Sequence, residues 1–251
     1  MTPNGSSGWP PRGSLSHERP FVRFPGWAPV EKPAVSYFSD VGALVRKDLL
    51  LEIRAKETVP AMLIFVVAAL TIFHFAVPTG DVPVAASQKV ALGLLWTAIV
   101  FTSLLGLTRA FVPEREQGLM DALVLAPSDR SAIWLGKAIS VFAFLAVTEA
   151  LALPAFAFFF YGVGWNVVAA IVLADIGISA VGTLLGAMAV AGRARELLLP
   201  LLFLPLAIPI IVGGVGASIA SGPKYLEFLG LYDGVFVLLS WAAFEYVVSE
   251  T

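Results

Sequence analysis

The chain has 251 residues and a net charge of −2; 58% of its residues are hydrophobic, 14% are charged, and its mean hydropathy is +0.86. Because a soluble domain carries about 25% charged residues, this composition excludes a soluble globular protein and predicts an integral membrane protein. The weak negative charge predicts no nucleic-acid partner, and the absence of cysteine excludes disulfides, thiolate catalysis, Fe–S clusters and cysteine zinc sites within these residues.

The N-terminal region divides into two parts. Residues 1–39 are rich in Pro, Gly and Ser and lack an apolar run long enough for a signal peptide, so we expect a disordered cytoplasmic tail. In residues 40–58, apolar side chains recur at every fourth position from Val41 to Ile53, with basic side chains between them. This spacing predicts an amphipathic helix lying on the membrane surface. An ordinary cytoplasmic helix is the alternative.

Residues 59–251 contain six apolar runs, each long enough to cross a hydrocarbon layer about 30 Å thick as a helix. We therefore predict an all-α integral membrane protein with six transmembrane helices. The third run is long for one crossing and contains Pro154, so we expect it to tilt or bend. The glycine-rich segment 213–234 predicts an outer loop with a re-entrant or interfacial piece. The six runs are residues 59–77, 90–111, 132–161, 167–191, 197–220 and 229–248.

The distribution of Lys and Arg predicts the orientation of these spans. Ten basic residues precede the first span or lie between the second and third or the fourth and fifth, whereas only Lys89 and Lys224 fall on the other side. Since basic residues accumulate in cytoplasmic loops, both termini should be cytoplasmic. We interpret Lys137, at the start of the third span, as a snorkelling cytoplasmic anchor. The ten are Arg46, Lys47, Arg54, Lys56, Arg109, Arg115, Arg130, Lys137, Arg193 and Arg195.

A short charged segment separates the second and third spans. Pro113 suits a first helical turn, the acidic residues that follow it complement the positive end of a helix dipole, and Pro127 stops the helix. A charged helix fixed between two spans can transmit force, whereas the alternative is a solvated loop helix. Its charges and apolar anchors, the predicted contact set, are Glu114, Arg115, Glu116, Gly118, Leu119, Asp121, Leu123 and Leu125.

Two carboxylates fall inside predicted spans, Glu149 in the third and Asp175 in the fourth. An isolated charge in hydrocarbon costs several kcal/mol, so each is a candidate for a transport path or a partner contact. The alternatives are a position near a membrane interface or a hydrogen bond at a helix contact, for which the candidate partners are Thr148, Ser179 and Thr183.

The fourth and fifth spans contain residues that shape helix packing. Gly182 and Gly186 form a small-residue face that lets another helix approach closely. Pro200, Pro205 and Pro209 remove backbone donors along the fifth span, so it should be bent and could flex during a transport cycle, although a static kink is equally compatible.

His74 is the one histidine within a predicted span, near its outer end. It is a weak candidate for a heme ligand, since heme iron is commonly held by His. A lone histidine at an interface more often serves in packing, which is the interpretation we favour. We predict no metal site and no resident cofactor.

Several segments together resemble the CcmB family, the permease subunit of the ABC transporter of cytochrome c maturation, also called heme exporter protein B. The Glu-Arg-Glu, Ala-Pro and Leu-Gly-Lys elements recur across type-2 ABC exporter permeases. The Arg-Ala-Arg-Glu turn at 193–196 and the proline-spaced fifth span are specific to the family. The matching pieces are residues 47–54, 105–109, 114–116 with Gly118, 125–127, 129–133, 135–137, 181–185, 193–196 and 197–200, with Pro205 and Pro209.

The resemblance implies an ABC-2 type permease in the bacterial cytoplasmic (inner) membrane, with a coupling helix at 114–125 that docks on a separate CcmA-like ATPase subunit. It also implies a CcmC-like heme-handling membrane protein and a CcmD-like small subunit as partners, and it is compatible with a homodimer. The chain should be non-catalytic, because Gly136-Lys137 lacks the remainder of a Walker phosphate loop.

The expected function is coupling of ATP hydrolysis on the partner to heme export, with heme as a substrate, or to release of a heme-loaded chaperone. One alternative is an exporter permease for lipid, drug or polysaccharide. Another is a non-transporting scaffold for heme-handling proteins. An enzyme is least expected, because no nucleophile, base and orienting group occur at usable spacing.

Overall fold

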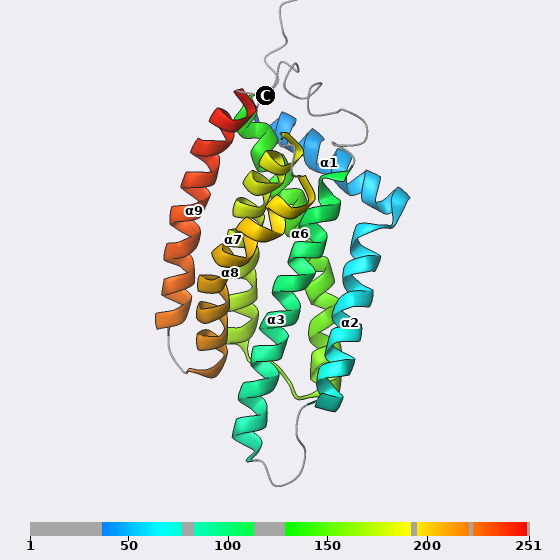
Figure 1. Ribbon diagram of the computed structural model, residues 1–251, viewed down its shortest axis with the longest axis vertical. Helices are drawn as coiled ribbons and strands as arrows, with labels where there is room; N and C mark the ends of the chain where they lie inside the picture. The colour runs from blue at the N-terminus through cyan, green and yellow to red at the C-terminus, as the bar shows by residue number, and fades with distance from the viewer. Residues whose placement is uncertain (1–36, 77–82, 113–128, 192–194, 221–222, 250–251) are drawn as a thin grey trace, which may run out of the picture. The chain divides into compact units, whose positions relative to one another are not determined.

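The computed structural model describes residues 37–76, 83–112, 129–191, 195–220 and 223–249. The described residues form seven α-helices (Figure 1). Six of these are long and apolar enough to cross a membrane, which confirms the predicted six-span, all-helical fold. The helices are α1 (Tyr37–Ala55), α2 (Thr58–Ala76), α3 (Val84–Ala110), α6 (Arg130–Phe159), α7 (Trp165–Ala191), α8 (Arg195–Ile219) and α9 (Lys224–Ser249).

The spans differ from the predicted ranges mainly at their beginnings. α3 begins at Val84 and α9 at Lys224, several residues before the apolar runs that predicted them. An apolar run marks the part of a helix that lies in hydrocarbon, whereas the backbone hydrogen bonds of the helix continue into its polar ends. Most of the tail predicted at 1–39 lies outside the described residues, and its predicted disorder stays a prediction.

α7 lies at the centre of the bundle, in contact with α6, α8, α9 and α3. Its contact with α3 depends on two glycines: a Cβ at Gly182 or at Gly186 would lie 2.3 Å from a side-chain carbon of Leu107 or Phe111, respectively. Both separations are far below van der Waals contact. The predicted small-residue face is therefore confirmed, and α3 is the helix that uses it.

The prediction of a re-entrant piece in residues 213–234 is wrong, because α8 continues to Ile219 and α9 begins at Lys224. Glycines in this segment make room for aromatic rings within the helices. A Cβ at Gly214 would lie 2.4 Å from the indole of Trp96, whose Nε1 donates a hydrogen bond of 2.9 Å to Ser218 Oγ.

The prolines lie inside helices that continue past them. α6 includes Pro154, and α8 includes Pro200, Pro205 and Pro209. Figure 1 shows α8 (gold) running obliquely near its start and more steeply toward its end, in agreement with the predicted bend. The predicted flexing of α8 during a transport cycle stays a prediction.

α1 crosses the ends of the spans (Figure 1) and packs mainly against α6. The two backbones approach closely at Gly136, where a Cβ would lie 2.8 Å from Leu44 Cβ and 3.5 Å from the carbonyl oxygen of Val41. Only glycine permits this separation. The contact holds α1 against the first part of α6 and positions the polar residues described next.

Candidate functional site

The predicted coupling helix lies in residues 113–128, which are outside the described residues. Its two flanks are described: α3 ends at Ala110, followed by Phe111 and Val112, and α6 begins at Arg130. The candidate site consists of the described residues that contact these flanks. The predicted contact residues outside the described ranges are Glu114, Arg115, Glu116, Gly118, Leu119, Asp121, Leu123 and Leu125.

Glu52 holds the corner between α1 and α2. The backbone turns at Lys56, whose φ of 55° is in the left-handed region and whose N–H donates to the Glu52 carbonyl at 2.7 Å. The Glu52 side chain then accepts hydrogen bonds from the backbone N–H groups of Thr58 and Val59, each 2.9 Å long. A carboxylate thereby satisfies two free donors at the positive end of the first span.

Asp48, one turn before Glu52, joins α1 to α6. Its Oδ2 lies 3.2 Å from Lys137 Nζ, and its Oδ1 lies 3.0 Å from Lys47 Nζ. The side chains of Asp48 and Lys137 are only 7% and 11% exposed. The snorkelling interpretation of Lys137 is therefore wrong: the ammonium group is directed into a buried ion pair, because a carboxylate on a neighbouring helix replaces the water that snorkelling would seek.

Lys137 also contacts the end of α3. Its Nζ lies 5.0 Å from the centroid of the Phe111 ring, within the range of a cation–π interaction. Phe111 in turn occupies the space beside Gly186 of α7. Phe111, two residues before segment 113–128, is thus in direct contact with Lys137, which lies about two helical turns after the start of α6.

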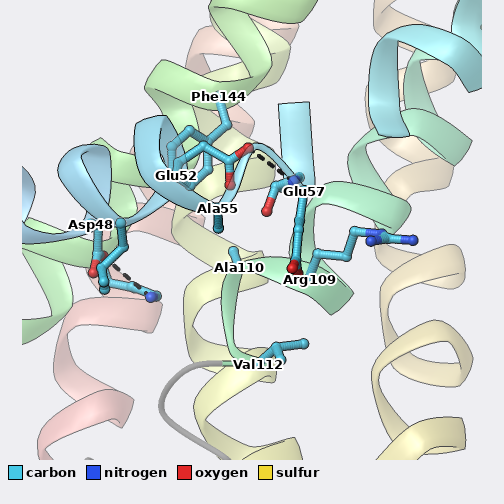
Figure 2. Close-up of a pocket in the computed structure, with 11 residues that line it drawn as sticks. Asp48, Glu52, Ala55, Glu57, Arg109, Ala110, Val112 and Phe144 are labelled. Atoms are coloured by element: carbon cyan, nitrogen blue, oxygen red, sulfur yellow. Dashed lines mark hydrogen bonds and ion pairs between the residues drawn. The ribbon is translucent and has the colours of Figure 1, made fainter. Parts of the chain in front are cut away.

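A cavity of about 230 Å³ lies among α1, α2, α3 and α6, next to these contacts (Figure 2). In Figure 2 the Arg109 side chain extends away from Asp48 and Glu52, which hold their hydrogen-bonding and ion-pair partners. The arrangement is a mixed-charge junction between helices. The lining residues are Asp48, Leu51, Glu52, Ala55, Glu57, Thr58, Arg109, Ala110, Val112, Lys137 and Phe144.

Glu149 and Asp175 lie close together at the contact between α6 and α7, where their carboxyl groups interact. They are 6% and 1% exposed, and Glu149 Oε2 and Asp175 Oδ1 have no partner among the described residues. Glu149 lies ten residues before the end of α6 at Phe159, and Asp175 lies ten residues after the start of α7. At 1.5 Å per residue both are about 15 Å from the α6–α7 turn, roughly the middle of a bilayer.

The alternative partners considered for these carboxyl groups hydrogen-bond elsewhere or not at all. Thr148 Oγ1 donates to the carbonyl of Phe144 at 2.8 Å, and Ser179 Oγ donates to that of Ile176 at 3.0 Å. Thr183 Oγ1 is buried without a hydrogen-bond partner in the described part of the chain. The structure thus pairs the two acids with each other, while their role in a transport path stays untested.

Sequence reasoning missed a third buried acid, Asp233 of α9. It is 6% exposed, neither carboxyl oxygen has a hydrogen-bond partner among the described residues, and its Oδ1 would lie 2.6 Å from a Cβ at Gly177 of α7. The signal was available, since Asp233 is a carboxylate inside a predicted span. Asp175 and Asp233 therefore mark the contacts of α7 with α6 and α9, respectively.

His74 packs among aromatic rings at the end of α2. Its ring centroid lies 5.4 to 5.6 Å from those of Phe75, Phe159 and Phe160. This agrees with the favoured packing interpretation. Within the described ranges, no group of three or more His, Asp and Glu residues has an arrangement that could hold a metal ion.

The model of the family described as CcmB protein matches residues 40–243, a range that begins in α1 and ends in α9. Heme exporter protein B of Rhodobacter capsulatus is 32% identical over 177 residues, covering 68% of this chain and 79% of the relative. Heme exporter protein B of Paracoccus denitrificans is 31% identical over 197 residues, covering 74% and 88%, respectively. With six helices able to cross a membrane and this match over most of its length, the chain belongs to the CcmB family.

Proposed function

We propose that this chain is the non-catalytic permease subunit of an ABC transporter of cytochrome c biogenesis, in which ATP hydrolysis on a partner subunit drives heme export or release of a heme-loaded chaperone. The observation that carries the proposal is the family match, which takes in most or all of every described helix. The similar proteins from Rhodobacter capsulatus and Paracoccus denitrificans are both named heme exporter protein B.

The proposed coupling element is the segment that contains Glu114, Glu116, Leu119 and Leu123, which would dock on a CcmA-like ATPase. Two features of the described residues support this position. The first flank reaches the mixed-charge junction at Ala110 and Val112, the second reaches it at Lys137, and that junction contacts α1, α2, α3 and α6. A displacement of the segment would therefore be transmitted to these four helices.

The proposed path for the transported group, or the contact for a partner, involves Glu149 and Asp175 with the proline-containing helix α8. The two acids lie between spans at about mid-membrane depth, where an acidic side chain is costly and is usually retained for function. α8 contacts α7 and α3, so a change in its bend would alter the packing of the central helix.

The remaining assignments follow from the family. The chain would lie in the bacterial inner membrane with cytoplasmic termini, beside a CcmC-like protein, a CcmD-like small subunit and a second copy of itself. Release of a heme-loaded chaperone differs from heme export in that no heme would cross through this subunit. The packing of His74 among phenylalanines favours that version, because the rings occupy the surroundings that a heme ligand would need.

Co-purification with the cognate ATPase tests the proposal. The variant combines Glu116→Lys with Leu123→Asp, which reverses a charge and removes an apolar anchor in the proposed docking helix. Glu227→Lys, a charge reversal of an exposed acid at the start of α9, is the matched control. ATPase binding and holo-cytochrome c yield are measured for each.

We expect the double variant to lose both binding and cytochrome yield, since an interface centred on a few anchors fails when a charge is buried in it. The Glu227→Lys control should retain both. Binding and yield that persist in the double variant would refute the coupling assignment and favour an unrelated exporter or a scaffold. A scaffold would also keep its function with a partner unable to hydrolyse ATP.

A further inference from the structure

We propose that Asp48 and Lys137 are positioning residues that couple α1 to the ATPase-driven movement, so that α1 and the start of α6 move as one unit and carry the movement to α2. This inference rests on the proposed function and names the route by which the coupling element would act. The residues that would transmit the movement belong to α1 and α6, not to the docking helix.

The first step of the argument is the strength of the link between α1 and α6. The Asp48–Lys137 pair is 3.2 Å long and almost entirely buried. A buried ion pair of this kind is geometrically specific, because separating it would take a buried ammonium group away from its carboxylate. Asp48 also pairs with Lys47 of its own helix, at 3.0 Å. The close approach of the two helices at Gly136, one residue before Lys137, places their backbones in contact beside the ion pair.

The second step is the place of this link in the chain. Lys137 lies about two helical turns after α6 begins at Arg130, and its ammonium group contacts the ring of Phe111 at the end of α3. Both flanks of the proposed coupling element therefore converge on one lysine. A displacement of either flank changes the position of the Lys137 ammonium group, and Asp48 follows it.

The third step connects α1 to a span. Glu52 is one helical turn from Asp48, and its carboxylate holds the first backbone N–H groups of α2 through two hydrogen bonds of 2.9 Å. Because the corner at Lys56 is tight, α1 cannot shift without moving the start of α2. The route thus runs from Lys137 through Asp48 and Glu52 to Thr58.

The test uses the full complex of this protein with its ATPase. The principal variant is the neutral pair Asp48→Asn with Lys137→Gln, which avoids leaving one buried charge alone. The second variant is the exchange Asp48→Lys with Lys137→Asp, combined with Lys47→Gln because Lys47 Nζ lies 3.0 Å from Asp48 Oδ1 and would repel the new lysine. Arg46→Gln, which neutralises an exposed residue on the same helix, is the control. Three quantities are measured: ATPase binding, ATP hydrolysis, and holo-cytochrome c formed per ATP hydrolysed.

For the neutral pair, we expect unchanged ATPase binding, hydrolysis within about twofold of the original, and a fall of about fivefold or more in cytochrome yield per ATP, as for a coupling residue that contacts neither partner. The exchanged pair should recover at least roughly half of the lost yield. Arg46→Gln should resemble the unmodified protein.

An unchanged yield per ATP in the neutral pair, or no recovery in the exchanged pair, would overturn the inference. A loss of ATPase binding in the neutral pair would also overturn it, because the residues would then serve folding or docking. Failure of the proposed function looks different: there the unmodified protein would not bind the ATPase, or binding would be insensitive to Glu116→Lys with Leu123→Asp.

Discussion

Three acidic side chains lie inside apolar helices, and they differ in the groups that surround them. Glu149 and Asp175 lie close enough to interact with each other, whereas Asp233 lies against Gly177 with both carboxyl oxygens unpartnered among the described residues. All three occupy apolar stretches that look alike in the sequence. Their different partners arise from the neighbouring helix that each one faces.

A pair of substitutions at Glu149 tests the contact with Asp175. We expect Glu149→Gln to keep the stability of the protein, because the amide has the size of the carboxyl group and can hydrogen-bond Asp175. Glu149→Ala should lower stability by about 1–3 kcal/mol, because it leaves a buried polar group without its partner. The midpoint of thermal unfolding in detergent measures both effects. Equal midpoints for the Ala and Gln variants would contradict this account.

The buried ion pair of Asp48 could not be predicted from the residues around it in the sequence. In the sequence Asp48 is one acid in a basic amphipathic stretch, and nothing local distinguishes it from an exposed side chain. Its partner Lys137 lies in another helix, far along the chain. The partner became evident only from the packing of α1 against α6.

At the scale of elements, close contacts between helices depend on glycines that lack a side chain at the point of crossing. Gly136, Gly182 and Gly186 permit α1 against α6 and α3 against α7. The hydropathy pattern predicted the helices themselves and the small-residue face of α7 but did not say which helix would use it. The re-entrant piece predicted within the glycine-rich segment 213–234 was wrong for the same reason, since the aromatic partner of Gly214, Trp96, is distant in the chain.

Substitution of Gly182 tests the α3–α7 contact. Gly182→Val should destabilise the bundle by about 1–3 kcal/mol, because the new side chain would overlap Leu107 and force the helices apart. Gly230→Val is the control, since a Cβ at this exposed glycine of α9 meets no atom within 4 Å. Thermal unfolding in detergent should show a lower midpoint for the first variant only. Similar midpoints for the two variants would mean that α3 and α7 can move apart without a loss of stability.

At the scale of the whole molecule, the asymmetric distribution of basic residues predicts which ends of the bundle face the cytoplasm. The absence of cysteine makes this prediction easy to examine with single introduced thiols. Gly42 of α1 and Gly162 of the α6–α7 turn are suitable sites, because both are exposed and a Cβ at either position meets no atom within 4 Å.

We expect a membrane-impermeant maleimide added to intact spheroplasts to label Gly162→Cys and to leave Gly42→Cys unlabelled until the membrane is permeabilised. The physical basis is the excess of Lys and Arg in cytoplasmic loops. The chain without introduced cysteine gives the background. Labelling of Gly42→Cys in intact cells would reverse the predicted orientation and separate the proposed coupling segment from any cytoplasmic ATPase.

The sequence by itself determined that the chain is a bundle of six apolar helices, because hydrocarbon leaves the backbone few other ways to satisfy its hydrogen bonds. It also carried the family resemblance and placed Glu149 and Asp175 inside spans. Only the tertiary structure decided that these acids face each other, that Lys137 pairs with Asp48, and that Glu52 holds the start of α2. The reason is that hydropathy records how each segment interacts with lipid, whereas the pairing of polar groups depends on which helix faces lie together.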